Sequence, residues 1–187
     1  MRKQLKWKLL AGVLVLAAAT TAAVVSVKAV DVSVTTPHAP VVERGLRAVM
    51  EHSVREQAQA VRKPAGLDLQ DPALAARAFG HYSAACRTCH GAPGAKADPW
   101  MVIYPAAPDL TKRKIVGAWS DEELFWILKH GVKDTGMMAL GPTHQDKDIW
   151  AVAAFVRQLP AMSPERYAEL AAAYRAQQEA PHAHHHH

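Results

Sequence analysis

The sequence is poor in cysteine, with two among its 187 residues, and aromatic residues make up only 6%. So few thiols exclude the set of several disulfides that stabilises small secreted domains. Acidic residues are absent before Asp31. Basic residues do occur in that N-terminal segment: Arg2, Lys3, Lys6, Lys8 and Lys28. Because the whole chain has a formal charge of +5, residues 31–187 are neutral overall, and the high isoelectric point gives no reason to expect nucleic-acid binding.

Charge is also missing from a long run near the N-terminus. From Leu9 to Val27 every residue is uncharged, and most are Leu, Val or Ala. About 20 such residues span a bilayer as a helix, and the lysines that precede the run favour a cytoplasmic N-terminus. The competing interpretation is a cleaved signal peptide with its cleavage site at Val27-Lys28-Ala29, but the run is longer than the usual core of about 7–15 residues. We therefore favour a retained transmembrane anchor, and both interpretations export the remainder of the chain.

The next segment predicts a linker and then an amphipathic helix. Pro37 and Pro40, with several β-branched residues, favour an extended chain from Val30 to Val41. From Glu43 to Arg62, apolar residues recur at three- and four-residue steps and predict one buried helix face: Leu46, Val49, Met50, Val54, Ala58 and Val61. Periodicity does not name what buries that face, which is either the rest of this chain or a membrane partner or lipid surface.

Both cysteines stand in the run Cys86-Arg87-Thr88-Cys89-His90, which has the form C-x-x-C-H, the attachment signature of a c-type haem. Two thiols at this spacing on a helical turn can each bond a vinyl carbon of the haem, and His90 can then supply the proximal iron ligand. The alternatives are a thioredoxin-like redox pair, which would follow a strand, and half of a zinc site, which would need further ligands. We predict one haem c, covalently bound through Cys86 and Cys89.

Helix signals surround this run. Asp71 followed by Pro72 is a good helix start, and that helix should deliver the chain to Cys86. The run Ser120-Asp121-Glu122-Glu123 is a capping box that opens a second helix, which should stop at Gly131. This neighbourhood is therefore expected to be helical.

The C-terminal part predicts two further helices. The first should run from Gln145 to Leu159, with Thr143 or His144 as its cap. The second should run from Ser163 to about Gln178. The histidine-rich end, residues 182–187, is either a tag or a native metal-binding tail, and it is excluded from the fold.

A second run with candidate iron ligands is the glycine-flanked loop Thr135-Gly136-Met137-Met138. A thioether is a soft, neutral ligand that favours ferrous iron and raises the reduction potential. Methionine is also a common core residue. Beside a C-x-x-C-H motif, the loop predicts a sulfur ligand, although spacing alone does not choose between Met137 and Met138.

With these residues placed, the segment from about Ala73 to Pro160 resembles a class I cytochrome c domain. The likeness is carried by Tyr82 before the first cysteine, by Ala107-Pro108-Asp109-Leu110 and by Thr135-Gly136-Met137. The longer pattern, with its anchor and amphipathic helix, is similar to membrane-anchored monohaem cytochromes of Gram-negative bacteria. That resemblance implies a single-pass protein of the bacterial cytoplasmic membrane with its haem domain in the periplasm.

The resemblance also implies roles for individual residues. In the family the proline carbonyl accepts a hydrogen bond from the proximal histidine, which points to Pro108, and the loop methionine is the second axial ligand, which points to Met137. Val152 and Phe155 have the spacing that packs the terminal helix on the first one. The chain departs from the family pattern at Met138, where many relatives have proline, and at Ala78, where they often have glycine.

The predicted fold is therefore all-α: a cytochrome c fold of three to five helices around one covalent haem, preceded by a transmembrane helix and an amphipathic helix. The expected divisions are an anchor (1–30), a linker with the amphipathic helix (31–70), the haem domain (71–160) and a C-terminal helix with the histidine-rich tail (161–187).

The expected function is transfer of single electrons between redox partners, without enzymatic activity. A membrane dehydrogenase, a quinol-oxidising complex or a terminal oxidase would be the partner, with no role for nucleic acid. The alternative is a haem enzyme or a gas or redox sensor with a labile sixth ligand, for which His81, His130 and His144 are candidate distal groups or alternative axial ligands. A third possibility is an assembly subunit that docks through the helix near Leu46.

Overall fold

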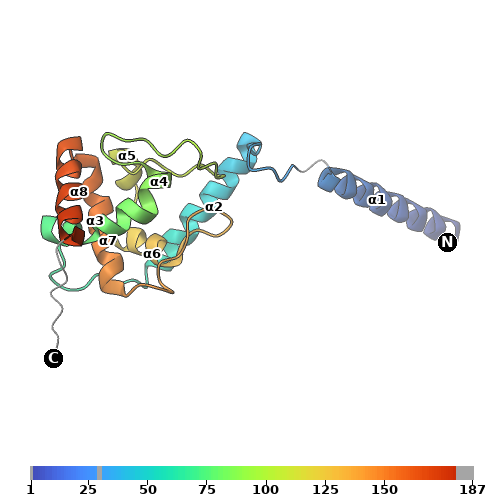
Figure 1. Cartoon of the computed structure of the whole chain (residues 1–187). Helices are drawn as coiled ribbons and strands as arrows, with labels where there is room; N and C mark the ends of the chain where they lie inside the picture. Colours follow the sequence, from blue (N-terminus) through green and yellow to red (C-terminus); the bar gives the residue numbers. More distant parts are fainter. Residues whose placement is uncertain (1, 29–30, 180–187) are drawn as a thin grey trace, which may run out of the picture. The chain divides into compact units, whose positions relative to one another are not determined.

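A computed structural model describes residues 2–28 and 31–179 of the chain. Over these residues the chain forms helices and loops with no strand, so the predicted all-α class is confirmed (Figure 1). The candidate cleavage site at Ala29 and the histidine-rich tail, residues 182–187, lie outside the described residues. The chain divides into two units, the first ending at Thr36, and each is described by itself.

The first unit is dominated by helix α1 (Arg2–Lys28). Its segment Lys6–Val24 has a mean hydropathy of 1.8 over 19 residues, and this length and apolarity suffice to cross a membrane. The hydroxyls of Thr20 and Thr21 donate to backbone carbonyls one turn earlier, so neither is left without a partner in an apolar environment. A signal sequence near an N-terminus can pass the same test of length and apolarity, so α1 alone does not decide between anchor and leader.

The second unit opens with α2 (Pro40–Ala58). The helix begins before the predicted Glu43, so the expectation of extended chain as far as Val41 is wrong at its end. Proline fits the first helical position, because its missing N–H would have no partner there and its φ is already helical. The helix also ends before the predicted Arg62, since the residues after Ala58 form turns.

The predicted buried face of α2 is confirmed for its C-terminal half only. Val54 and Ala58 are 2% and 4% exposed, and this half packs against α6 (Asp121–His130). Leu46 and Val49, by contrast, are 57% and 69% exposed. The helix therefore presents apolar side chains to solvent in its first turns.

The core of the second unit forms where α3 (Pro72–His81) packs on α7 (Asp146–Gln158), which also packs on α6. The Phe155 ring lies 6.1 Å from Phe79 and 4.9 Å from Tyr82, between ring centroids, and it is fully buried. Ala78, 4% exposed, lies on the buried side of α3, where a small side chain permits close packing of helices. The predicted packing of Phe155 on the first helix of the domain is confirmed.

The C-terminal end adds α8 (Pro164–Glu179) after a short 3-10 turn, η2 (Leu159–Ala161). Tyr167 and Tyr174 of α8 pack on Phe79 of α3, with ring centroids 5.1 and 5.9 Å away. Tyr174 lies so close to Gly80 that a Cβ there would fall 2.3 Å from its ring, so glycine permits this approach. The last helix is therefore part of the domain packing.

Two local features differ from the sequence prediction. The N-cap of α7 is Gln145, and neither Thr143 nor His144 caps it, because the Thr143 hydroxyl bonds the Leu140 carbonyl and the His144 ring instead. A short helix, α5 (Arg113–Val116), was not predicted at all.

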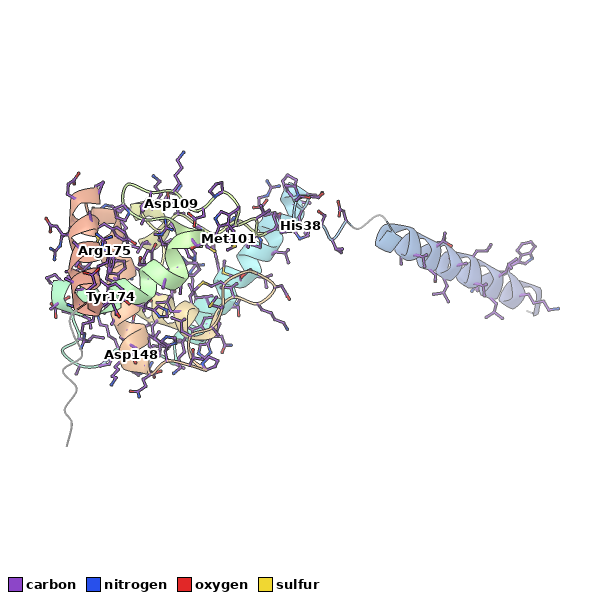
Figure 2. The ribbon with its side chains drawn as sticks, viewed as in Figure 1. His38, Met101, Asp109, Asp148, Tyr174 and Arg175 are labelled. Carbon is purple, nitrogen blue, oxygen red and sulfur yellow. The ribbon has the colours of Figure 1, made fainter. Side chains whose placement is uncertain are left out.

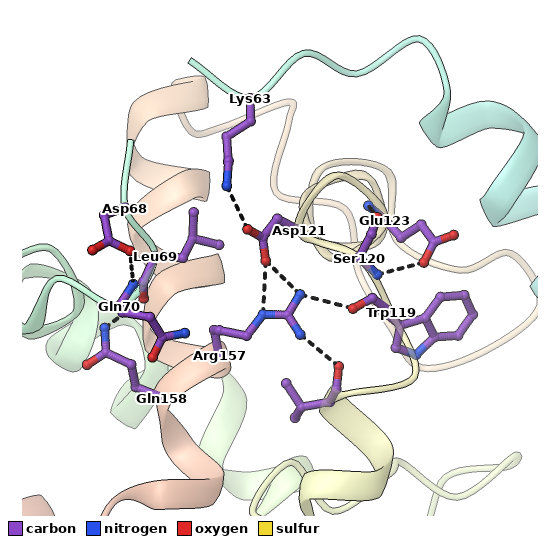
Figure 3. Close-up of polar contacts among 11 residues, drawn as sticks. Lys63, Asp68, Leu69, Gln70, Trp119, Ser120, Asp121, Glu123, Arg157 and Gln158 are labelled. Atoms are coloured by element: carbon purple, nitrogen blue, oxygen red, sulfur yellow. Dashed lines mark hydrogen bonds and ion pairs between the residues drawn. The ribbon is translucent and has the colours of Figure 1, made fainter. Parts of the chain in front are cut away.

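A polar network joins α7 to the beginning of α6 (Figure 3). Arg157 pairs with Asp121 at 2.8 Å, and Lys63 reaches the same carboxylate at 2.9 Å. The Arg157 guanidinium also donates to the backbone carbonyls of Val116 and Trp119. One side chain of α7 thus fixes the corner between α5 and α6.

Candidate cofactor site

The C-x-x-C-H run lies on a continuous helical path. Helix α3 passes into a π-helical turn, η1 (Tyr82–Cys86), and then into the single turn α4 (Arg87–His90). Gly91 ends this path with φ of 72°, a conformation that favours glycine. Both cysteines and the histidine are therefore carried on one short, hydrogen-bonded segment, as the sequence predicted.

The two thiols are free and half-buried. Burial, followed by the neighbouring Cys89, raises the pKa of the Cys86 thiol to about 11. Thiol–disulfide exchange requires a thiolate, so a protonated, buried thiol on a helix does not suit a thioredoxin-like pair. Within residues 2–28 and 31–179, no three His, Cys, Asp or Glu side chains gather as metal ligands, so a zinc site is not favoured either.

The ring of His90 has a defined orientation. Its Nδ1 lies 2.8 Å from the carbonyl oxygen of Pro108, which can only accept, so Nδ1 carries the proton. Burial lowers the pKa of His90, although the bond to Pro108 acts the other way. The neutral ring therefore keeps its lone pair on Nε2, the arrangement that a metal-binding histidine needs.

Contacts from other segments hold the attachment turn in place. The buried Tyr82 hydroxyl donates to the Gly91 carbonyl at 2.7 Å, and burial raises the pKa of Tyr82. Arg87 forms an ion pair with Asp98 at 3.5 Å, and the backbone N–H of Asp98 donates to the Thr88 carbonyl. Both ends of the turn are thus fixed by the chain that precedes and follows it.

The methionine loop begins where α6 ends. Gly131 has φ of 67°, and a Cβ there would lie 2.6 Å from the Met137 carbonyl oxygen. The Met137 carbonyl accepts from Val132 N–H, and the Met137 N–H donates to the Thr135 hydroxyl at 3.1 Å. Met137 is partly buried against the core, whereas Met138 is 63% exposed. Burial thus distinguishes Met137 from Met138, which the spacing alone could not do.

The structure joins some of the candidate residues directly. His90 and Pro108 share a hydrogen bond, and Cys86 and Met137 both contact the same hydrophobic core. No hydrogen bond or ring contact links Met137 to His90 among the described residues. The roles of these residues toward a haem stay predictions.

The three other candidate histidines have ring contacts of their own. His81 and His144 contact each other, with ring centroids 4.6 Å apart, and the ring of His130 lies against Trp126. Burial and the neighbouring His144 lower the pKa of His81.

Sequence reasoning missed the residue that supports the segment between Pro108 and α6. Arg157 lies in an apolar helix and looks there like a surface residue. Its guanidinium is partly buried, with 16% of the side chain exposed, and it bonds the carbonyl at the end of α5, the carbonyl of Trp119 and one carboxylate. Its position after a run of apolar residues in a core helix could have indicated that Arg157 is partly buried and paired.

The residues present fit a covalently attached haem. The donor set consists of two free thiols at the attachment spacing, an imidazole whose Nδ1 is held by a carbonyl, and one partly buried thioether. Two thiols serve covalent attachment, and imidazole nitrogen and thioether sulfur are iron donors that occur in c-type cytochromes.

Comparison with protein families agrees with this chemistry. Residues 73–156 match the family described as Cytochrome C oxidase, cbb3-type, subunit III. The matched segment begins in α3 and ends in α7, so it includes the attachment turn, Pro108 and the methionine loop. No curated protein and no solved structure matches the chain significantly.

Proposed function

We propose that this chain, whose residues 73–156 form a c-type cytochrome domain, carries single electrons between redox partners at the outer face of a bacterial cytoplasmic membrane. A domain of this family generally serves as a haem-based electron carrier and not as an enzyme. The observation that carries the proposal is the attachment turn, where two thiols and a histidine oriented by Pro108 stand on one helical segment.

In this proposal Cys86 and Cys89 hold one haem c through thioether bonds, and His90 and Met137 bind its iron. The haem supplies a one-electron iron couple. The protein would supply a nitrogen from His90 and a sulfur from Met137 to the iron, which would leave no ligand position for a substrate or a gas.

The protein residues also tune that couple. The Pro108 carbonyl accepts the Nδ1 proton of His90 and so increases the basicity of the ligating Nε2. A thioether from Met137 favours ferrous iron, so a raised reduction potential is expected. The neighbouring Met138 is exposed to solvent, so we do not assign it as an iron ligand.

The membrane anchor would concentrate the domain near its partners. Helix α1 is long and apolar enough to remain in the membrane, and a tether raises the effective concentration of a weakly docking protein without new contacts. A terminal oxidase is the partner that the family description favours, and a membrane dehydrogenase or a quinol-oxidising complex fits the same chemistry.

Optical spectra of the haem-loaded protein test the proposal. The ferric protein should be low-spin with a sulfur–iron charge-transfer band, and Met137→Ala should abolish that band and give a high-spin form that binds carbon monoxide once reduced. Met138→Ala is the matched control and should keep the parent spectrum, because that side chain is exposed.

Two results would contradict the proposal. A parent protein that is high-spin and binds carbon monoxide as readily as Met137→Ala would favour the sensor or enzyme alternative. Retention of the sulfur–iron band by both variants would remove the assignment of the sulfur ligand.

A further inference from the structure

The first turns of α2 carry apolar side chains that nothing in the domain covers. Large side chains in these turns are well exposed: Val41 at 68%, Val42 at 45%, Leu46 at 57% and Val49 at 69%. With 3.6 residues per turn, these four positions fall within an arc of about 140°. Arg47 lies on the opposite side of the helix. We call these four residues the α2 stripe.

The stripe is separate from the face that α2 buries in its own domain. Val54 and Ala58, which are buried, lie outside the arc of the stripe and belong to the half that packs against α6. The helix therefore has two apolar sides, and only one has a partner within the domain. An amphipathic helix with an open apolar face and charged residues opposite is the pattern of a helix that lies in a membrane interface.

More exposed apolar surface lies in the loop next to the beginning of α2. Tyr104 of this loop contacts His38: its hydroxyl accepts from the His38 N–H at 2.9 Å, and the two ring centroids are 5.1 Å apart. Figure 2 labels His38 at this end of the helix. The same loop exposes Trp100 at 69% and Val102 at 58%. Tryptophan is enriched where membrane meets water.

The sequence itself limits how far the stripe can lie from a membrane. Only residues 29–39 separate Lys28, the end of α1, from Pro40. A fully extended chain covers at most about 3.6 Å per residue, so this segment spans no more than roughly 40 Å. The short connection does not favour contact of the stripe with a soluble partner. If α1 crosses the membrane, the same connection keeps the stripe close to the lipid surface beside α1.

We propose that the α2 stripe lies in the surface of the lipid bilayer that α1 crosses, with Arg47 directed toward water. The inference rests on the retained anchor proposed above and extends it. Since the C-terminal half of the same helix is packed on α6, contact of the stripe with lipid would give the whole cytochrome domain one preferred orientation on the membrane. Electron transfer would then take place from a fixed side of the domain.

Site-directed spin labelling of the full-length haem-loaded protein tests this. Haem attachment uses both native cysteines, so Leu46→Cys introduces a single reactive thiol on the stripe, and Arg47→Cys places the matched control on the opposite side. Each labelled protein is inserted in nanodiscs of phosphatidylethanolamine and phosphatidylglycerol. Collisions of the nitroxide with oxygen and with a water-soluble nickel chelate are then measured.

The proposal expects the label at position 46 to lose its collisions with the nickel chelate in nanodiscs and to keep those with oxygen. The label at position 47 should keep both. Equal nickel access at the two positions, in protein that remains in the nanodisc, overturns the stripe proposal and leaves the anchor intact. Protection of position 46 that appears only after a membrane oxidase is added also overturns it, in favour of a protein partner. Release of the full-length chain from the nanodisc overturns the anchor and this inference together.

Discussion

The attachment turn, residues 86–91, and the methionine loop, residues 131–138, both include a glycine with positive φ that follows a helix, with φ of 72° at Gly91 and 67° at Gly131. They differ in what holds them. The attachment turn is fixed from outside, by the Tyr82 hydroxyl and by the chain around Asp98. The loop is held mainly by its own backbone, through the bond from Val132 to Met137 and the tight contact at Gly131.

This difference predicts different responses to damage. A segment fixed by several side chains loses stability in small steps, because each contact can be removed without the others. A loop that depends on its backbone conformation changes at once when that conformation is disturbed. The imidazole side of the site should therefore tolerate more change than the thioether side.

The largest effect is expected from glycine substitutions that compare the two segments directly. A Cβ at position 131 would lie 2.6 to 2.9 Å from three backbone atoms, whereas at Gly91 the nearest atom is 3.0 Å away. Gly131→Ala should lower the free energy of unfolding by roughly 3 kcal/mol and abolish the sulfur–iron band, and Gly91→Ala should cost roughly 1–2 kcal/mol and keep it. Denaturant unfolding and ferric spectra measure both; equal losses would remove the contrast.

The next effect concerns the buried tyrosine. Tyr82→Phe leaves the Gly91 carbonyl without its donor and should cost about 1–2 kcal/mol of stability. The ferric spectrum should stay low-spin, because the methionine loop is not touched. Tyr174→Phe is the control, since that hydroxyl makes no hydrogen bond within the described chain, and it should change the unfolding midpoint little. A midpoint equal to that of the parent in Tyr82→Phe would show that the bond adds nothing.

A pH-dependent effect is expected at Asp121. Burial opposes its ionisation, but Lys63 and Arg157 outweigh burial and lower the pKa of Asp121. A lowered pKa adds stability above the ordinary value near 4, and this is lost as the pH falls through the folded pKa. Asp121→Asn should therefore cost about 1 kcal/mol at neutral pH and make unfolding less sensitive to acid below about pH 4.

The matched control for Asp121 lies in the methionine loop. Asp134 forms no ion pair in the part of the chain that the structure describes, and its φ of 58° is one that asparagine accepts. Asp134→Asn should keep the parent response to acid. If Asp121→Asn also loses stability in acid as the parent does, carboxylates other than Asp121 cause the acid sensitivity.

The smallest effect is expected at Thr135, whose hydroxyl donates to the Val132 carbonyl and accepts from the Met137 N–H. Thr135→Val should cost about 0.5–1 kcal/mol. The sulfur–iron band should disappear at a lower temperature than in the parent, while the protein is still folded. Thr135→Ser keeps the hydroxyl and should restore the parent behaviour; a serine variant as labile as the valine one would point to packing instead.

The parts of the fold that the sequence predicted well have local causes. Asp71 accepts from Ala73 N–H at the start of α3, and the Ser120–Glu123 capping box opens α6 as expected. Such signals act between residues a few positions apart, so they can be read without knowing the tertiary structure. The same holds for the C-x-x-C-H run on its helical turn.

The parts that were missed depend on distant residues. The short helix α5 is stabilised where Arg157 reaches the Val116 carbonyl, a contact between residues far apart in the chain. The face of α2 changes from open to buried along its length because α6 covers only its second half. The difference in burial between Met137 and Met138 likewise depends on the core against which Met137 lies, so spacing alone could not give it.

The packing of α3 on α7 has a consequence for the order of events during maturation. The Tyr82 ring packs against Phe155, which follows the cysteines by most of the length of the domain. As the chain is made from its N-terminus, the attachment turn is therefore present before the ring that packs beside Tyr82. The surroundings that bury Tyr82 are complete only when α7 has been made and has packed on α3.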